Sequence, residues 1–125
     1  MKLIRLSSLL TWKHFKYCRE LIPNEYIDWN IFEGNIKAFT LIFISHRWIT
    51  INHPDPNGNQ LRELQNRLNR LFDKNSRERI VIFYDYCSTF QRPRTPDEDI
   101  QFYKDISDLG SLLRNSSKII ILSEG

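Results

Sequence analysis

Two apolar runs of the sequence end in side chains that could do chemistry. The runs cover 39–44 and 80–84. The residues that follow them are Ser45, His46, Arg47 and Trp48 in the first case, and Asp85 and Ser88 in the second. Histidine is a common general acid or base, a carboxylate can stabilise developing positive charge, and arginine can form paired hydrogen bonds with phosphate. If both runs are buried parallel strands, their carboxyl ends meet at one sheet edge, where α/β proteins bind ligands. The alternative is a core strand followed by an ordinary polar turn.

A third apolar run, 118–122, and two proline-bearing loops bring further polar residues to the same expected edge. The run is followed by Ser123 and Glu124, and the loops contribute Asp55, Gln91, Arg92, Arg94 and Glu98. Charges of both signs together with hydroxyl groups suit a phosphate-bearing ligand. Arg92 and Arg94 could equally form a solvated loop tip. The sequence lacks the glycine-rich patterns of dinucleotide dehydrogenases and P-loop proteins, so those two classes have no support.

His46 has two interpretations. It could act as a general acid or base, or it could be a rim histidine that is hydrogen-bonded to backbone, which is the simpler expectation. A nucleophilic Ser45 or Ser88 would need a histidine partner, and Ser45 and His46 are neighbours on a strand, so their side chains point to opposite faces. No spacing indicates a metal site, although His46, His53 and Asp85 are residue types that could form one.

The apolar pattern predicts a βαβαβ unit that would position these side chains. Strands are expected at 39–45, 80–84 and 118–122. One helix is expected from a cap at Asn57 or Asn59 to Asp73, and a second from the capping box Thr95-Pro96-Asp97-Glu98 to Leu113. Right-handed crossovers would place the strand at 39–45 between the other two. The predicted fold class is therefore a three-layer α/β fold with a parallel sheet.

The N-terminal part carries a different pattern. Apolar residues recur every three to four positions between 9 and 22, which predicts an amphipathic helix that ends at Pro23. The segment 26–32 fits a short strand or an ordered connector. We therefore expect an N-terminal helical extension at 1–38 and an α/β domain at 39–125.

Length and composition limit the protein class. The chain has 125 residues, of which 41% are hydrophobic and 26% charged, as expected for one compact domain. A net charge of +3 does not favour nucleic acid as a partner. Cys18 and Cys87 are isolated, show no zinc-binding spacing and are expected to be reduced thiols. No segment is long enough to span a bilayer and no signal-peptide cleavage site is evident, so a cytoplasmic protein without a membrane partner is expected.

Three segments of the sequence resemble TIR (Toll/interleukin-1 receptor) domains, in particular bacterial-type variants with Ser-His-Arg-Trp and His-Pro-Asp-Pro motifs. They are the start at 43–48 with the loop at 53–56, the strand at 81–85 with its long following loop, and the closing strand at 119–123. The resemblance covers roughly residues 39 to 123. It implies a flavodoxin-like fold with strand order 2-1-3. It also implies either cleavage of the N-glycosidic bond of NAD⁺ or assembly of TIR chains in immune signalling, which in bacteria is usually anti-phage defence. The loop 86–95 would border the nucleotide pocket.

The family's catalytic glutamate lies on a helix after the third strand, and this sequence ends at Gly125 before such a helix. We expect a truncated domain, a substitute carboxylate or a non-catalytic protein. The candidate catalytic residues are Glu124, Glu98 and Asp85. The candidate ligand-binding residues are Ser45, His46, Arg47, Trp48, Ser88, Arg92, Arg94 and Ser123. No cofactor is expected, since NAD⁺ would be a substrate; the expected partners are NAD⁺ or a related nucleotide, and other TIR-like chains or a companion effector. The alternatives are a non-catalytic TIR-like assembly module and, less well supported, a nucleoside- or nucleotide-sugar-processing enzyme.

Overall fold

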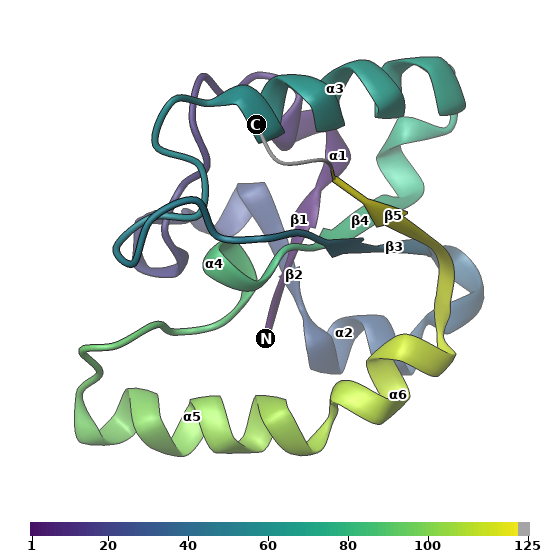
Figure 1. Ribbon diagram of the computed structural model, residues 1–125. Helices are drawn as coiled ribbons and strands as arrows, with labels where there is room; N and C mark the ends of the chain where they lie inside the picture. Colours follow the sequence, from purple (N-terminus) through teal and green to yellow (C-terminus); the bar gives the residue numbers. More distant parts are fainter. Residues whose placement is uncertain (123–125) are drawn as a thin grey trace.

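The computed structural model describes residues 1–122, which form an open five-stranded sheet with helices on both faces (Figure 1). The strand order is β2-β1-β4-β3-β5. The strands are β1 (Lys2–Arg5), β2 (Tyr26–Asp28), β3 (Thr40–Ser45), β4 (Ile80–Phe83) and β5 (Ser116–Ile121). The α-helices are α1 (Leu6–Leu9), α2 (Trp29–Gly34), α3 (Asn59–Leu71), α4 (Asp85–Ser88), α5 (Pro96–Ser107) and α6 (Leu109–Arg114).

Strands β3, β4 and β5 have the predicted parallel arrangement. β3 lies between β4 and β5, and its Phe43 is level with Phe83 on one side and Ile119 on the other. The predicted strands and their order are therefore confirmed. Parallel pairing brings the carboxyl ends of β3 and β4 to one edge of the sheet, so the residues that follow these two strands meet there.

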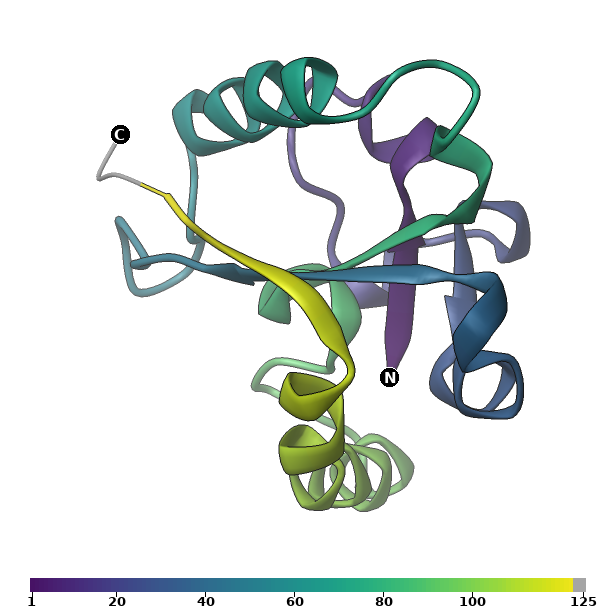
Figure 2. The same cartoon turned by 90° about the vertical axis from the view of Figure 1, so that its right-hand side faces the viewer.

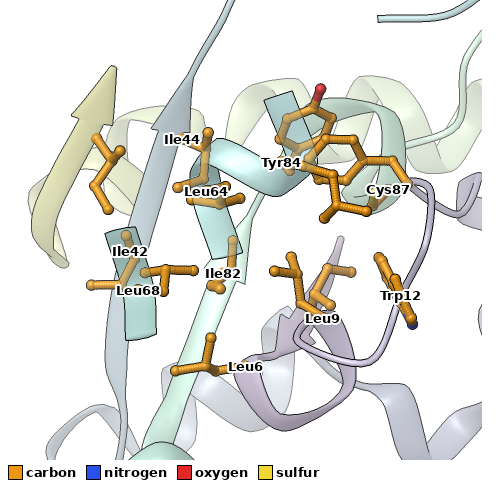
Figure 3. Packing of buried hydrophobic residues seen from close by; sticks show 14 of the residues in the cluster. Leu6, Leu9, Trp12, Ile42, Ile44, Leu64, Leu68, Ile82, Tyr84 and Cys87 are labelled. Carbon is orange, nitrogen blue, oxygen red and sulfur yellow. The ribbon is translucent and has the colours of Figure 1, made fainter. Parts of the chain in front are cut away.

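The sheet is the middle of three layers (Figure 2). Successive residues of a strand point to opposite faces. Ile42 and Ile82 accordingly face the layer that contains α1 and α3, while Leu41 and Val81 face the layer that contains α2 and α6. The first of these cores is shown in Figure 3. Burial on both faces explains why β3 and β4 read as unbroken apolar runs in the sequence, whereas Ile119 and Ile121 of the edge strand β5 are largely exposed.

The helix predicted over 9–22 is wrong, and the N-terminal part contains two strands besides the helices α1 and α2. Residues 1–38 supply β1 and β2, and β1 pairs antiparallel with both β2 and β4, so that the sheet is mixed. After the short α1 the chain follows an irregular path that buries Trp12, Phe15 and Cys18 without helical geometry. Gln65 of α3 donates through its side-chain amide to the carbonyls of Leu9 and Trp12, at 2.9 and 2.8 Å, which satisfies backbone groups that a continuing helix would have used.

The two longer helices begin at specific caps. The capping box of α5 is confirmed, because the Thr95 hydroxyl accepts the Glu98 N–H and the Glu98 carboxylate accepts the Thr95 N–H. The cap of α3 is not an asparagine as predicted. The buried carboxylate of Asp55 accepts the N–H groups of Gln60 and Leu61, both at 2.9 Å. The helix predicted to reach Leu113 is instead divided into α5 and α6.

No helix within residues 1–122 combines the length and the apolar character needed to cross a membrane.

Candidate functional site

A cleft of about 570 Å³ lies beside the segments that follow β3 and β4. It is lined by aromatic and basic side chains with a few amides, namely Tyr17, Arg19, Trp48, Ile51, Asn52, Tyr86, Gln91, Arg92, Pro93, Arg94 and Phe102. Three parts of the chain meet here: the N-terminal segment around 17–19, the loop after β3, and the loop between α4 and α5. The cleft is therefore at the sheet edge where the sequence predicted a site.

Asp85 is the carboxylate that these loops hold in place. Its Oδ1 accepts the Tyr86 N–H at 2.7 Å and lies 2.6 Å from Nε2 of His46, while its Oδ2 accepts the Trp48 indole N–H at 3.1 Å. Burial alone would raise the pKa of Asp85, but the hydrogen bonds from His46, Trp48 and the backbone outweigh it and hold the pKa below its ordinary value. Asp85 is thus a fixed, ionised acceptor at neutral pH.

His46 supports Asp85 from inside the protein. Its ring stacks on Tyr84 at 4.0 Å between centroids, and Phe15 stacks on Tyr84 at 3.9 Å, so the three rings form one stack. The His46 side chain is only 3% exposed, and its Nδ1 is buried and has no hydrogen-bond partner in the part of the chain that the structure describes. Since Nε2 is engaged by Asp85 and Nδ1 is shielded, neither nitrogen is available to a substrate. This geometry gives His46 the role of positioning Asp85 instead of acting as an acid or base.

Three arginines line the cleft, and two of them are already engaged. Arg94 donates to Asp99 at 2.7 Å and to the Phe90 carbonyl at 3.2 Å, and its guanidinium lies 3.9 Å from the centroid of the Phe102 ring. Arg19 is paired with Glu98 and donates to the Pro93 carbonyl.

Arg92, by contrast, is exposed and has no hydrogen bond or ion pair with any residue in 1–122. Of the three arginines of the cleft in the described chain, it has the guanidinium available for a ligand.

The loop that carries Arg92 is tied to the rest of the site through Gln91. The Tyr17 hydroxyl donates to the Gln91 carbonyl at 2.9 Å and accepts the Gln91 N–H at 3.1 Å. The Gln91 side-chain amide donates to the Asp85 carbonyl at 3.2 Å. These bonds hold the loop against both the N-terminal segment and the end of β4, so Arg92 projects from a supported position.

Glu98 is occupied by structural interactions. Hydrogen bonds from the Arg19 guanidinium and from the Thr95 N–H lower the pKa of Glu98 from 4.5 to about 2. A carboxyl with so low a pKa stays ionised at neutral pH and cannot donate a proton there. The hypothesis that Glu98 replaces the family's catalytic glutamate therefore gains no support from its surroundings.

This low pKa predicts an acid dependence of stability. A carboxyl whose pKa is lower in the folded state contributes stability that is fully present above its unfolded pKa and is lost as the pH falls through its folded pKa. We expect the difference in urea midpoint between the wild type and Glu98→Gln to be largest above pH 5 and to vanish towards pH 2. The control is Asp97→Asn, because Asp97 has no hydrogen bond or ion pair within the described residues. A difference that stays constant from pH 6 to pH 2 would contradict the expectation.

The other predicted ligand-binding residues are spread more widely. Ser45 ends β3 and its carbonyl accepts the Leu122 N–H. Arg47 is exposed, and its carbonyl accepts the Gln60 side-chain amide at 2.7 Å. Ser88 is buried, and its hydroxyl accepts the Tyr84 N–H; it does not line the cleft but a second cavity of about 250 Å³. Ser123 and Glu124 lie outside the described residues.

Several residues of the cleft were not among the predicted site residues. The apolar pattern predicts a helix at Tyr17 and Arg19, and nothing in their sequence context indicates that the chain folds back to the loop after β4. Tyr86 lies next to Asp85 and contacts Trp48 and His53 through its ring. The sequence feature that could have identified it as a cleft residue is an aromatic side chain close behind the second predicted strand.

No group of three metal-binding side chains occurs within residues 1–122. His53 shares in the aromatic cluster, but its Nδ1 accepts the Asp55 N–H at 2.8 Å and is therefore used in the loop. Burial lowers the pKa of His53, which keeps the ring neutral at neutral pH. His46, His53 and Asp85 accordingly do not form the metal site considered from their residue types.

Comparison of the chain with protein-family models, with curated proteins and with solved structures gives no match. The side chains of the cleft are therefore the observations from which a function can be inferred.

Proposed function

We propose that the cleft binds a nucleotide, and that the protein is a TIR-like domain with a flavodoxin-like fold in nucleotide-linked immune or anti-phage signalling. The observation that carries the proposal is Arg92, which has no partner among residues 1–122 and lies at the rim of a cleft lined by aromatic rings. Arginine is well suited to bind a phosphate through two parallel hydrogen bonds. Aromatic faces such as those of Trp48 and Tyr86 can stack on a base.

The size and charge of the cleft agree with this ligand class. Small-molecule sites have volumes of roughly 300–1,000 Å³, and the cleft has about 570 Å³. Arg19 and Arg94 are paired with Glu98 and Asp99, whereas no carboxylate in residues 1–122 is paired with Arg92, so Arg92 leaves a positive charge at the rim that attracts anions. A purely apolar ligand would leave Arg92 unused, and a cationic ligand would be repelled.

NAD⁺ is the nucleotide that the TIR resemblance favours, and its cleavage is a separate question from its binding. Loss of nicotinamide needs a carboxylate near the ribose to stabilise developing positive charge. In the described residues the two candidate acids are Asp85, which is held by three hydrogen bonds, and Glu98, which is paired with Arg19. We therefore propose nucleotide binding as the main function of the cleft and expect little or no nicotinamide release in an assay of the 125-residue chain.

The test of nucleotide binding is a charge reversal at Arg92. Arg92→Glu removes the free guanidinium and adds a repulsive carboxylate, and the loss of a charge-assisted hydrogen bond costs about 1.5–3 kcal/mol. We expect the dissociation constant for ADP or NAD⁺, measured by isothermal titration calorimetry, to rise at least tenfold.

The matched control for this test is Arg70→Glu, which makes the same change of net charge on the exposed side of α3. Arg70→Glu should leave the affinity for ADP or NAD⁺ within about twofold of the wild-type value, because exposed charges further apart than about 10 Å are largely screened at 0.1 M salt. Equal weakening by both variants would show that only the overall charge matters. Absence of binding to the wild type would refute the proposal.

The assembly module remains the second candidate, because the protein exposes apolar side chains on α5. Ile100, Tyr103 and Ile106 lie at three-residue spacing on one side of this helix and are 69%, 63% and 45% exposed. Exposed apolar groups that are close together are typical of protein interfaces. Sedimentation analysis with and without nucleotide separates the two candidates, since a module that only assembles would associate without ligand.

A further inference from the structure

Asp85 has one acceptor position left on its carboxylate. An ionised carboxylate offers about four lone-pair positions, two on each oxygen. His46 and the Tyr86 N–H use both positions of Oδ1, and the Trp48 indole uses one position of Oδ2. The remaining position of Oδ2 can accept one more hydrogen bond. The Asp85 side chain as a whole keeps 41% of its surface exposed, so a ligand can approach the carboxylate from outside.

Asp85 is not one of the residues in 1–122 that line the cleft, but three residues bonded to it are. Trp48, Tyr86 and Gln91 all bond to Asp85 and all line the cleft. Trp48 and Tyr86 belong to its aromatic part, whereas Gln91 directly precedes Arg92. Asp85 is thus joined both to the rings expected to stack on a base and to the loop expected to hold a phosphate. In every nucleotide the sugar lies between base and phosphate.

We propose that Asp85 is a specificity-determining residue that accepts a hydrogen bond from a ribose hydroxyl of the bound nucleotide; the inference rests on the proposed nucleotide function of the cleft. Three donors hold the carboxylate, so it cannot turn towards water when a bound ligand covers it. A ligand that lacks the hydroxyl therefore leaves a fixed negative charge poorly solvated. Sites built in this way reject analogues that lack the donor. The cleft should therefore select ribonucleotides over nucleotides without sugar hydroxyls.

His46 and Trp48 are positioning residues in this proposal. His46 is stacked on Tyr84 and holds Oδ1, while Trp48 holds Oδ2. Neither has to touch the sugar. Within residues 1–122 the Nδ1 of His46 is buried without a partner, so the polar contact of this ring is the one that Nε2 makes with Asp85.

The experiment compares ADP with 2′,3′-dideoxy-ADP by isothermal titration calorimetry on the full chain, using the wild type and Asp85→Asn. The amide of Asn has the same shape but carries no charge and offers one oxygen in place of two. We expect the wild type to bind ADP at least tenfold more tightly than the dideoxy analogue, and Asp85→Asn to reduce this preference to less than twofold. Circular dichroism and thermal unfolding check that the variant is folded.

The other outcomes separate this inference from the function on which it rests. If the wild type binds both nucleotides equally well, the role of Asp85 is refuted while the nucleotide function stands. If Asp85→Asn keeps the full preference for ADP over the dideoxy analogue, another residue binds the sugar hydroxyls and the inference is refuted. If neither nucleotide binds, the proposed function fails. Should Asp85→Asn not fold, the comparison of ADP with its dideoxy analogue in the wild type still decides whether the protein recognises the sugar hydroxyls.

IDP, which lacks the amino group of adenine, tests whether the Asp85 carboxylate accepts a hydrogen bond from the base instead of from the sugar. We expect IDP to bind the wild type within threefold of ADP. A loss of tenfold or more for IDP, together with equal binding of ADP and its dideoxy analogue, would overturn the assignment to ribose.

Discussion

A Leu64→Asp variant is expected to lose the folded state under native conditions. Leu64 lies on the inner side of α3, is fully buried and belongs to the same core as Ile42 and Ile82 (Figure 3). A carboxylate at this position would be surrounded by apolar side chains and would cost several kcal/mol, a large part of the roughly 5–15 kcal/mol that stabilises a typical domain. Circular dichroism and urea titration should show no cooperative unfolding transition.

The control for this variant adds the same charge to the same helix. Asn66 is exposed on α3, so the free energy of unfolding of Asn66→Asp should lie within about 0.5 kcal/mol of the wild-type value, as is usual for surface substitutions. A Leu64→Asp protein that unfolds cooperatively at the midpoint of the wild type would show that this side of α3 does not pack on the sheet.

The second large effect is expected for Tyr84→Ala, because Tyr84 is the middle ring of the stack between Phe15 and His46. The side chain is fully buried, and burial also raises the pKa of its hydroxyl. Removing a buried aromatic ring costs about 3–5 kcal/mol. The loss should also free the ring of His46, so we expect the affinity for ADP to fall in any Tyr84→Ala protein that still folds. Urea unfolding and calorimetry measure the two effects separately.

Tyr84→Phe is the matched control, since it keeps the ring and removes only the hydroxyl. That hydroxyl donates to the side-chain carbonyl of Gln60 at 3.2 Å. The loss of one hydrogen bond costs about 1 kcal/mol. If Tyr84→Phe destabilises as much as Tyr84→Ala, the hydrogen bond and not the ring stack is the important contact.

The parallel part of the fold could be predicted because its signals are local. β3, β4 and β5 are apolar on both faces, which is a pattern that few other structures produce. The capping box before α5 needs only four residues to be recognised. In the site, the closeness of His46 and Asp85 followed from the expectation that two parallel strands end at one edge, and the 2.6 Å contact agrees with it.

The N-terminal part could not be predicted in the same way. β1 and β2 have four and three residues, too few to show an alternating pattern. The stripe from 9 to 22 correctly marks Trp12, Phe15 and Cys18 as buried, but burial every third or fourth residue does not require a helix. Here the tertiary contacts decide, because β1 is held by β4 and the following turn is held by Gln65.

Tertiary contacts also explain why the sequence does not predict the N-terminal part of the cleft, Tyr17 and Arg19. Tyr17 and Arg19 reach the loop after β4 through the Gln91 backbone and through Glu98, which are more than seventy residues away in sequence. A pairing over such a distance leaves no periodic signal. The sequence also could not distinguish Arg92 from Arg94, because only the fold brings Asp99 and Phe102 to Arg94.

Nucleotide binding at the cleft can be observed directly through the tryptophan indoles, because the three tryptophans report on three different places. Trp48 lines the cleft, Trp29 lines the second cavity, and Trp12 is buried in the core. A titration with ADP, followed by ¹H–¹⁵N NMR, should shift the indole signal of Trp48 in a saturable manner and leave those of Trp12 and Trp29 unchanged. A shift of the Trp29 signal without one of Trp48, or no shift of any indole at millimolar ADP, would contradict the proposal that the cleft is a nucleotide site.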